Sequence, residues 1–288
     1  MYNPEEAFLR KHIPREEELC PDEERVYQKY VLEYKKQKPE MDDFSDIYPE
    51  IEIKKDRNYL TQIKEGFQFC KTERSEILEI VLAKQVEQAN WLGENCFIVQ
   101  SSEYDDIINH TDLIAEFREK DEIIRLAIDV TTSENKAVLD KKIGFIEKDI
   151  DDGKLTTLKY YLFEETEPHV KGRAEMIPRV IIGTNKEGVK ELSGLVKKTI
   201  EKEEGSNKKL ADFYAQIEFL EEIKGQLEYF IDYAKTKKEC APEHPLINRQ
   251  EKVLDIIDRI LKNKKRSMSL PSRARTNGVY KFLTNLSF

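Results

Sequence analysis

Two apolar segments, each carrying an aspartate, constrain the fold of this chain more than any other feature. They span residues 111–117 and 123–131, and the polar stretch 118–122 separates them. Both are rich in β-branched and aliphatic residues, so the pattern predicts an antiparallel hairpin. One register pairs apolar residues along a whole face: Phe117 with Ile124, Ala115 with Leu126, and Leu113 with Ile128.

The same register fixes the pairs on the other face, because side chains alternate along a strand. It places Glu116 opposite Arg125, Ile114 opposite Ala127, and Asp112 opposite Asp129. Directly opposed residues have Cβ atoms about 4.5 to 5.5 Å apart, and like charges there are destabilising. A bound divalent cation would explain the two aspartates. Alternatively, Asp112 is a turn or cap residue and Asp129 accepts hydrogen bonds from backbone amides near the following helix.

Composition indicates a globular protein. The chain has 288 residues, of which 39% are hydrophobic, enough to form a substantial core. No apolar run approaches the roughly 20 residues of a membrane helix, and the acidic N-terminal sequence is unlike a signal peptide, so we expect a cytoplasmic protein with no membrane partner. The cysteines show no Cys-x-x-Cys spacing, which argues against a zinc knuckle. Among the histidines, only His110 is near the two aspartates in sequence.

The periodicity predicts an α/β domain with helices on either side of the hairpin. The expected order is a helix over 75–91, a strand over 96–100, a loop containing 103–106, the hairpin, a helix from 132 to about 151, and strands over 157–163 and 178–183. Further helices are expected over 186–202, 208–238 and 246–261. We therefore divide the chain into an irregular N-terminal extension (1–74), an α/β core (75–205), a C-terminal helical hairpin (206–265) and a basic tail (266–288).

This order of elements resembles the PD-(D/E)XK nuclease superfamily over about residues 75–163. The resemblance implies a restriction-endonuclease-like mixed sheet flanked by helices. It makes Asp112 and Asp129 the metal-binding acids. The family's lysine falls at Thr131, which is a departure from the pattern. Some members carry this lysine on the following helix, which makes Lys136, Lys141 and Lys142 candidates; Lys159 is a further candidate, and the helix glutamate of many members would be Glu87 or Glu79.

The function implied by the resemblance is metal-dependent hydrolysis of phosphodiester bonds in nucleic acid, DNA before RNA. Mg²⁺, or Mn²⁺ in its place, would be held by Asp112, Asp129 and Glu87, because Mg²⁺ favours a few carboxylates together with water and phosphate oxygens. A lysine would stabilise the charge that develops on the phosphate. Because Thr131 occupies the usual lysine position, a catalytically inactive nuclease-like module that binds nucleic acid or a protein is the alternative. The segment 103–131 is also similar to proteins of small-genome bacteria.

The charge of the chain is unevenly distributed. From Lys262 onward there are seven basic residues and no acidic one, whereas the whole chain has a net charge of −9. Such a cluster attracts phosphates regardless of sequence, and Tyr280 and Phe282 could stack on bases. The alternative is a solvated basic terminus that interacts with a helix dipole. The expected nucleic-acid contacts are Lys264, Lys265, Arg266, Arg273 and Arg275.

Overall fold

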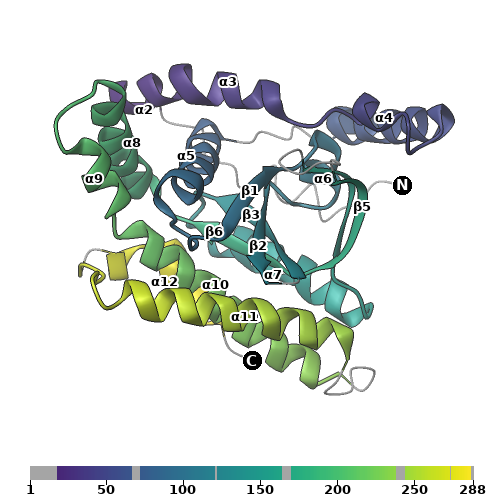
Figure 1. Ribbon diagram of the computed structural model, residues 1–288. Helices are drawn as coiled ribbons and strands as arrows, with labels where there is room; N and C mark the ends of the chain where they lie inside the picture. The colour runs from purple at the N-terminus through teal and green to yellow at the C-terminus, as the bar shows by residue number, and fades with distance from the viewer. Residues whose placement is uncertain are drawn as a thin grey trace.

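A four-stranded mixed sheet forms the centre of the structure, which is a computed structural model describing residues 18–66, 72–120, 122–163, 170–237, 244–272 and 274–286. Its strands lie in the order β1 (Cys96–Gln100), β2 (Leu113–Glu119), β3 (Glu122–Thr131) and β6 (Arg179–Gly183) (Figure 1). Strands β1, β2 and β3 are antiparallel neighbours, and β6 runs parallel to β3. The predicted α/β class with a mixed sheet is confirmed.

The hairpin of β2 and β3 has the predicted register. Leu113 pairs with Ile128, Ala115 with Leu126, Phe117 with Ile124, Glu116 with Arg125, and Ile114 with Ala127. The predicted salt bridge across the strands is present, since Arg125 Nε lies 2.7 Å from Glu116 Oε1. The turn is tighter than expected, because β2 continues to Glu119 and β3 already begins at Glu122.

The fourth strand of the central sheet is β6, and the segment 157–163 lies outside this sheet. That segment is β4 (Thr156–Phe163), which pairs with β5 (Val170–Ile177) in a separate two-stranded sheet. All five residues of β6 are buried, as expected for a strand in a parallel pair between covered faces. β4 alternates between buried and half-buried residues, which suits a hairpin that packs by one face.

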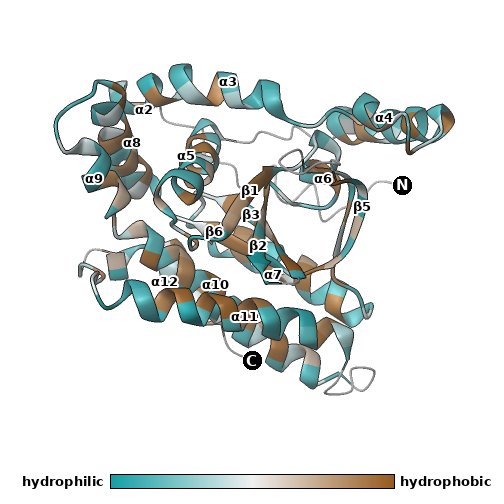
Figure 2. Ribbon diagram, viewed as in Figure 1, coloured by the Kyte–Doolittle hydropathy of each residue, from teal (hydrophilic) through white to brown (hydrophobic). Residues whose placement is uncertain are grey.

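Different helices cover the two faces of the sheet. On one face, α5 (Glu73–Ala89) packs on the apolar residues of the hairpin, including Leu126 and Ile128. On the other face, α7 (Lys136–Asp151) packs on β6, and the β4–β5 hairpin covers Ile114 and Ala127. The hydrophobic residues are concentrated on the central strands and along the helices that contact them (Figure 2). The segment expected to be a loop around 103–106 is a short helix, α6 (Glu103–Ile108), capped by Ser102.

The C-terminal helices close the open edge of the sheet. After α8 (Lys186–Ile200) and α9 (Ser206–Ala211), the helices α10 (Ala215–Lys235) and α11 (Pro245–Lys264) pack side by side, which confirms the predicted helical hairpin (Figure 1). Gln226 of α10 accepts a hydrogen bond from Ile181 N (2.8 Å) and donates one to Ile181 O (2.7 Å). Glu222 accepts one from Gly183 N at 3.0 Å. These side chains occupy backbone groups of β6 that a further strand would otherwise pair with.

The described part of the N-terminal extension is mostly helical, which corrects the expectation of an irregular segment. It contains α2 (Pro21–Val26), η1 (Tyr27–Val31), α3 (Leu32–Tyr34), η2 (Lys35–Gln37), η3 (Met41–Phe44) and α4 (Glu50–Gly66). A buried ion pair between Glu23 and Arg74, with Nε 2.7 Å from Oε1, ties α2 to α5. α4 escaped prediction because its buried apolar stripe is narrow, consisting of Ile53 and Leu60.

The basic tail is also folded where the structure describes it. It forms η4 (Ala274–Thr276) and α12 (Gly278–Thr284), and α12 packs against α10. Among the described helices, none has the length and apolar character needed to cross a membrane.

Candidate functional site

Asp112 and Asp129 lie at the same end of the hairpin. Asp112 immediately precedes β2, and its backbone N–H donates to Ile128 O at 2.9 Å. Asp112 therefore lies beside the end of β3 that contains Asp129, one residue beyond the last cross-strand pair, Leu113 with Ile128. Both residues are buried, with 5% and 7% of their surfaces exposed. Two carboxylates at such a position need compensating partners, since burying an unpaired charge is costly.

Each carboxylate has a partner that fixes it. Asp112 Oδ2 accepts a hydrogen bond from the backbone N–H of Val130 at 2.6 Å, across the end of the hairpin. Asp129 Oδ1 accepts one from the ammonium of Lys142. The bond from a backbone N–H to Asp112 agrees with the alternative in which these aspartates have a structural role and accept hydrogen bonds from the backbone. Lys142 is one of the three lysines on α7 that the nuclease resemblance made candidates.

Lys142 is the candidate lysine that reaches the acid pair, and the phase of α7 explains why. Residues 142, 145 and 149 follow one another at helical spacing and form a stripe next to the apolar stripe of the same helix. Lys136 is exposed in the first turn, and the ammonium of Lys141 lies 5.5 Å from the ring centroid of Phe145. Lys159, on β4, pairs with Glu52 (2.6 Å) and Asp56 (2.5 Å).

His110 lies beside the acid pair, in the segment that leads into β2. Its ring stacks on Phe145 of α7, with centroids 4.7 Å apart and planes at 14°, and its backbone has a left-handed φ of 51°. Burial lowers the pKa of His110 to about 4; Arg179 and Lys142 lower it as well, and Asp129 opposes them. The imidazole is therefore neutral at physiological pH and adds no charge to the site.

Arg179 is a buried cation of the site that the sequence analysis did not single out. Its Nη1 donates to the carbonyl of Asn109 at 2.6 Å, and its Nη2 lies 3.3 Å from Asp149 Oδ2 on α7. Burial lowers the pKa of Arg179, and the carboxylates of Asp149 and Asp129 oppose this effect. The guanidinium remains charged, because arginine is not deprotonated in proteins. The sequence feature that could have indicated a role for Arg179 is its position as a single arginine at the start of an otherwise apolar strand.

Thr131 has a structural role at the end of β3. Its hydroxyl accepts a hydrogen bond from Ser133 N at 3.2 Å, and its carbonyl accepts one from Thr184 N at 3.3 Å. The neighbouring position on β6 is Gly183, where an added Cβ would come within 2.5 Å of Thr131 O. This tight contact fixes the turn out of β3. Thr131, at the lysine position that the resemblance implies, thus shapes the turn toward α7.

The predicted third metal ligand is not brought to the acid pair. Glu87 is exposed on α5 and acts electrostatically on Cys96, which pairs with Phe117 at the far end of β2 from Leu113. Glu79 lies 3.7 Å from Lys38. Within the described ranges, no group of three or more His, Cys, Asp or Glu side chains is arranged to hold a metal ion. Asp112 and Asp129 alone would be compatible with Mg²⁺, which often uses one or two carboxylates and fills its other positions with water and substrate phosphate.

Two of the five predicted nucleic-acid contacts in the tail have partners within the protein. Lys264 donates to Gln216, and its burial lowers its pKa. Lys265 lies 2.5 Å from Glu221. The hydroxyl of Tyr280 also bonds Glu221, and Phe282 packs on an apolar cluster. Arg266 and Arg275 are exposed, and Arg273 lies outside the described residues.

Comparisons of the chain with protein-family models, with curated proteins and with solved structures found no match.

Proposed function

We propose that this protein hydrolyses phosphodiester bonds in nucleic acid, with DNA as the preferred substrate, at a site composed of Asp112, Asp129 and Lys142. The observation that carries the proposal is the ion pair between Lys142 and Asp129, next to Asp112, whose carboxylate accepts a hydrogen bond from Val130 N. Two acids and a lysine on the helix after the second acid are what the nuclease resemblance implies when its usual lysine position, here Thr131, holds another residue.

The order of elements supports the same proposal. The chain forms a helix (α5), three antiparallel strands (β1, β2, β3), a helix (α7) and a strand parallel to the third (β6), in this order. The short helix α6 is inserted between β1 and β2, and the β4–β5 hairpin before β6. This order and sheet arrangement fit a restriction-endonuclease-like fold. The acids lie at the end of β3 next to the start of β2, where such a site is expected.

The residues of the site have distinct chemical tasks in this proposal. A divalent cation held by Asp112 and Asp129 would lower the pKa of a bound water and neutralise charge on the phosphate. The bond from Val130 N fixes the carboxylate of Asp112 in one orientation. Lys142, whose side chain is 26% exposed, presents a positive charge next to Asp129, where it can stabilise an oxyanion of the phosphate. His110 is neutral and stacks on Phe145, so it adds no second positive charge beside Lys142.

Cleavage of plasmid and single-stranded DNA by the full chain in Mg²⁺ or Mn²⁺ tests the proposal. We expect Asp129→Asn to abolish cleavage and Lys142→Ala to slow it by about a hundredfold, the usual effect of removing one charge-stabilising donor. Lys136→Ala is the matched control, because this lysine is exposed in the first turn of the same helix, and it should cleave like the wild type.

Metal binding is measured independently of cleavage. Mg²⁺ or Mn²⁺ should raise the Tm, because a ligand that binds only the native state stabilises it. The Asp112→Asn, Asp129→Asn double variant should lose this response. An equal response in the double variant would show that the cation binds elsewhere.

A non-catalytic nuclease-like module is the second candidate, and a specific observation favours it. The acid pair already has internal partners in Val130 N and Lys142, and the described residues supply no third carboxylate. If the protein binds DNA in a salt-sensitive way but cleaves neither substrate in the presence of metal, it is a non-catalytic module and not a nuclease.

A further inference from the structure

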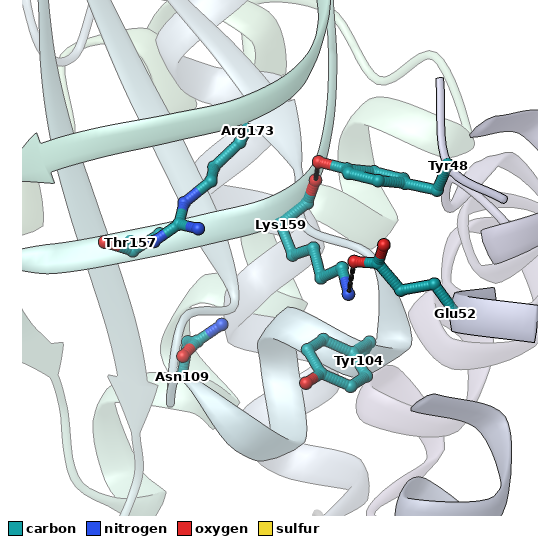
Figure 3. A pocket seen from close by; sticks show the side chains of 7 residues that line it. All are labelled: Tyr48, Glu52, Tyr104, Asn109, Thr157, Lys159 and Arg173. Carbon is teal, nitrogen blue, oxygen red and sulfur yellow. Dashed lines mark hydrogen bonds and ion pairs between the residues drawn. The ribbon is translucent and has the colours of Figure 1, made fainter. Parts of the chain in front are cut away.

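A pocket of about 320 Å³ is lined in part by the β4–β5 hairpin. Its wall is assembled from segments far apart in the chain: the turn before α4, α4 itself, α6 and the residue after it, β4, and β5 (Figure 3). The volume is at the lower end of the range of small-molecule sites, which is about 300 to 1,000 Å³. The pocket therefore suits a ligand of the size of one aromatic heterocycle and its sugar.

Two tyrosine rings of the wall are held in place without a ligand. Tyr48 and Tyr104 each contact the buried ring of Tyr160 edge-on, at centroid distances of 5.5 Å and 5.3 Å. The hydroxyl of Tyr48 also donates to the carbonyl of Lys159 at 2.8 Å. Rings that are fixed in advance lose little entropy when a planar ligand packs on them.

The charges of the pocket balance, which argues against a site for a free anion. The ammonium of Lys159 is held between Glu52 and Asp56, at 2.6 Å and 2.5 Å. Arg173 extends from β5 toward Thr157 on β4 (Figure 3) and pairs with Glu175 at 2.6 Å. Each cation thus already has a carboxylate partner, so a phosphate alone would meet little uncompensated positive charge.

The remaining polar groups suit the edge of a neutral heterocycle. Asn109 offers an amide whose Nδ2 is oriented by a 2.6 Å bond to Asp105, and Thr157 offers a hydroxyl. An amide and a hydroxyl supply both donors and acceptors, as base recognition in single strands requires.

Asn109 connects the pocket to the candidate site. Its side chain lines the pocket, while its carbonyl accepts the hydrogen bond from Arg179. The next residue is His110, which stacks on Phe145 one helical turn from Lys142. The pocket and the acid pair are therefore neighbours along a single chain segment.

We propose that this pocket receives one nucleobase of a single-stranded nucleic acid, packed on the tyrosine rings and contacted at its edge by Asn109 and Thr157. This inference rests on the proposed function and places the base of the strand beside the phosphodiester that is cut. In this proposal Arg173, a lining residue whose side chain is 63% exposed, contacts the base or its sugar phosphate.

Binding of a short single-stranded oligodeoxynucleotide to the full chain carrying Asp129→Asn tests the proposal without cleavage. The comparison ligand is an oligomer of the same length built only of abasic sugar phosphates. We expect the base-containing oligomer to bind more tightly by about fivefold or more, the usual effect of stacking one base on an aromatic ring. Tyr104→Leu should remove most of this preference. Tyr59→Leu should keep it, since Tyr59 is 47% exposed on α4 and outside the pocket.

A second variant covers the case in which Tyr104→Leu unfolds. Arg173→Gln changes a side chain that is 63% exposed, and Arg259→Gln is its matched control, at 62% exposed and paired with Glu119 in the same way. Arg173→Gln should weaken binding of the base-containing oligomer, and Arg259→Gln should not. Equal binding of the two oligomers, or unchanged binding in folded Tyr104→Leu and Arg173→Gln, would overturn the pocket proposal.

The pocket and the proposed function can fail separately. Suppose that binding depends on the bases, that Tyr104→Leu removes this dependence, and that the protein shows no metal-dependent cleavage. This result would support the pocket proposal and contradict the proposed nuclease activity. Cleavage that depends on Asp129, with no preference for the base-containing oligomer, would support the nuclease activity and contradict the pocket proposal.

Discussion

Gln226 pairs with the backbone of Ile181 through both ends of its side-chain amide, so that α10 continues the hydrogen bonding of β6. Replacing it with leucine keeps the bulk but leaves a buried N–H and a buried carbonyl unpaired. We expect Gln226→Leu to lower the free energy of unfolding by about 3 kcal/mol, since each orphaned group costs about 1 to 3 kcal/mol. Urea denaturation measures the effect. Gln88→Leu, at an exposed position, should stay within about 0.5 kcal/mol of the wild type.

Lys142 should contribute to stability as well as to chemistry. Lys142→Met leaves the carboxylate of Asp129, only 10% exposed at its side chain, without its cation. The loss should be about 3 kcal/mol, as for other broken buried pairs. In the Lys142→Met, Asp129→Asn double variant the loss should be smaller than the sum of the single losses. Strict additivity in this cycle would mean that the two side chains do not interact in solution.

The low pKa of His110 predicts a loss of stability in mild acid. Its pKa is about 4 in the folded protein, below the ordinary value of 6.5, because burial disfavours the charged imidazolium. The unfolded chain then takes up a proton before the native state does, so stability present above pH 6.5 is lost as the pH falls toward 4. The difference between these two pKa values corresponds to a loss of about 3 kcal/mol in the free energy of unfolding.

Urea denaturation at pH 7 and at pH 4.5 checks this expectation. His110→Phe, which preserves a ring against Phe145, should lose less stability between these two pH values than the wild type. His244→Asn is the control, because asparagine can cap α11 in place of the imidazole that accepts from Leu246 N. A decline as steep in His110→Phe as in the wild type would assign the acid sensitivity to other groups.

Glu222 should destabilise the protein near neutral pH. It is fully buried on α10, and burial raises its pKa well above 4.5, with Glu218 and Glu221 adding to the effect. An acid whose pKa is raised in the folded state does not destabilise the protein at pH values below its unfolded pKa. As the pH rises above that value, the destabilisation increases. Glu222→Gln can still accept from Gly183 N and should therefore raise the free energy of unfolding at pH 8 but not at pH 4. Glu251→Gln, a half-exposed position on α11, should show no such pH-dependent gain.

The hairpin at the centre of the fold was predictable because one register satisfied every cross-strand pair. Shifting β2 by one residue would turn Leu113, Ala115 and Phe117 away from the core, so the hydrophobic pattern alone specified the pairing. The same hairpin places Asp112 beside the end of β3 that contains Asp129, through the bonds from Asp112 N to Ile128 O and from Val130 N to Asp112. The α7 helix was equally clear from its apolar periodicity, and this restricted the lysine to one of three positions.

Several features depend on contacts between distant segments and could not be read from local pattern. Both β4 and β6 have the composition of strands, and only packing against α7 and α10 decides that β6 joins β3. Arg179 enters the site through bonds to Asn109 and Asp149, which are 70 and 30 residues away in sequence. The tail was read as a nucleic-acid arm from its charge, yet Tyr280 and Phe282 pack against the body of the protein.

The construction of the tyrosine-lined pocket sets when it can form during folding. The β2–β3 hairpin joins neighbours in sequence and can form within microseconds. Tyr48, Tyr104 and Arg173 are 56 and 69 residues apart in the sequence, and they meet only when their segments have all docked. Such non-local assembly is slow, because the entropy of closing long loops is lost before the contacts form. Nucleotide binding to the pocket would therefore develop in the last kinetic phase of refolding, and would report on complete tertiary assembly.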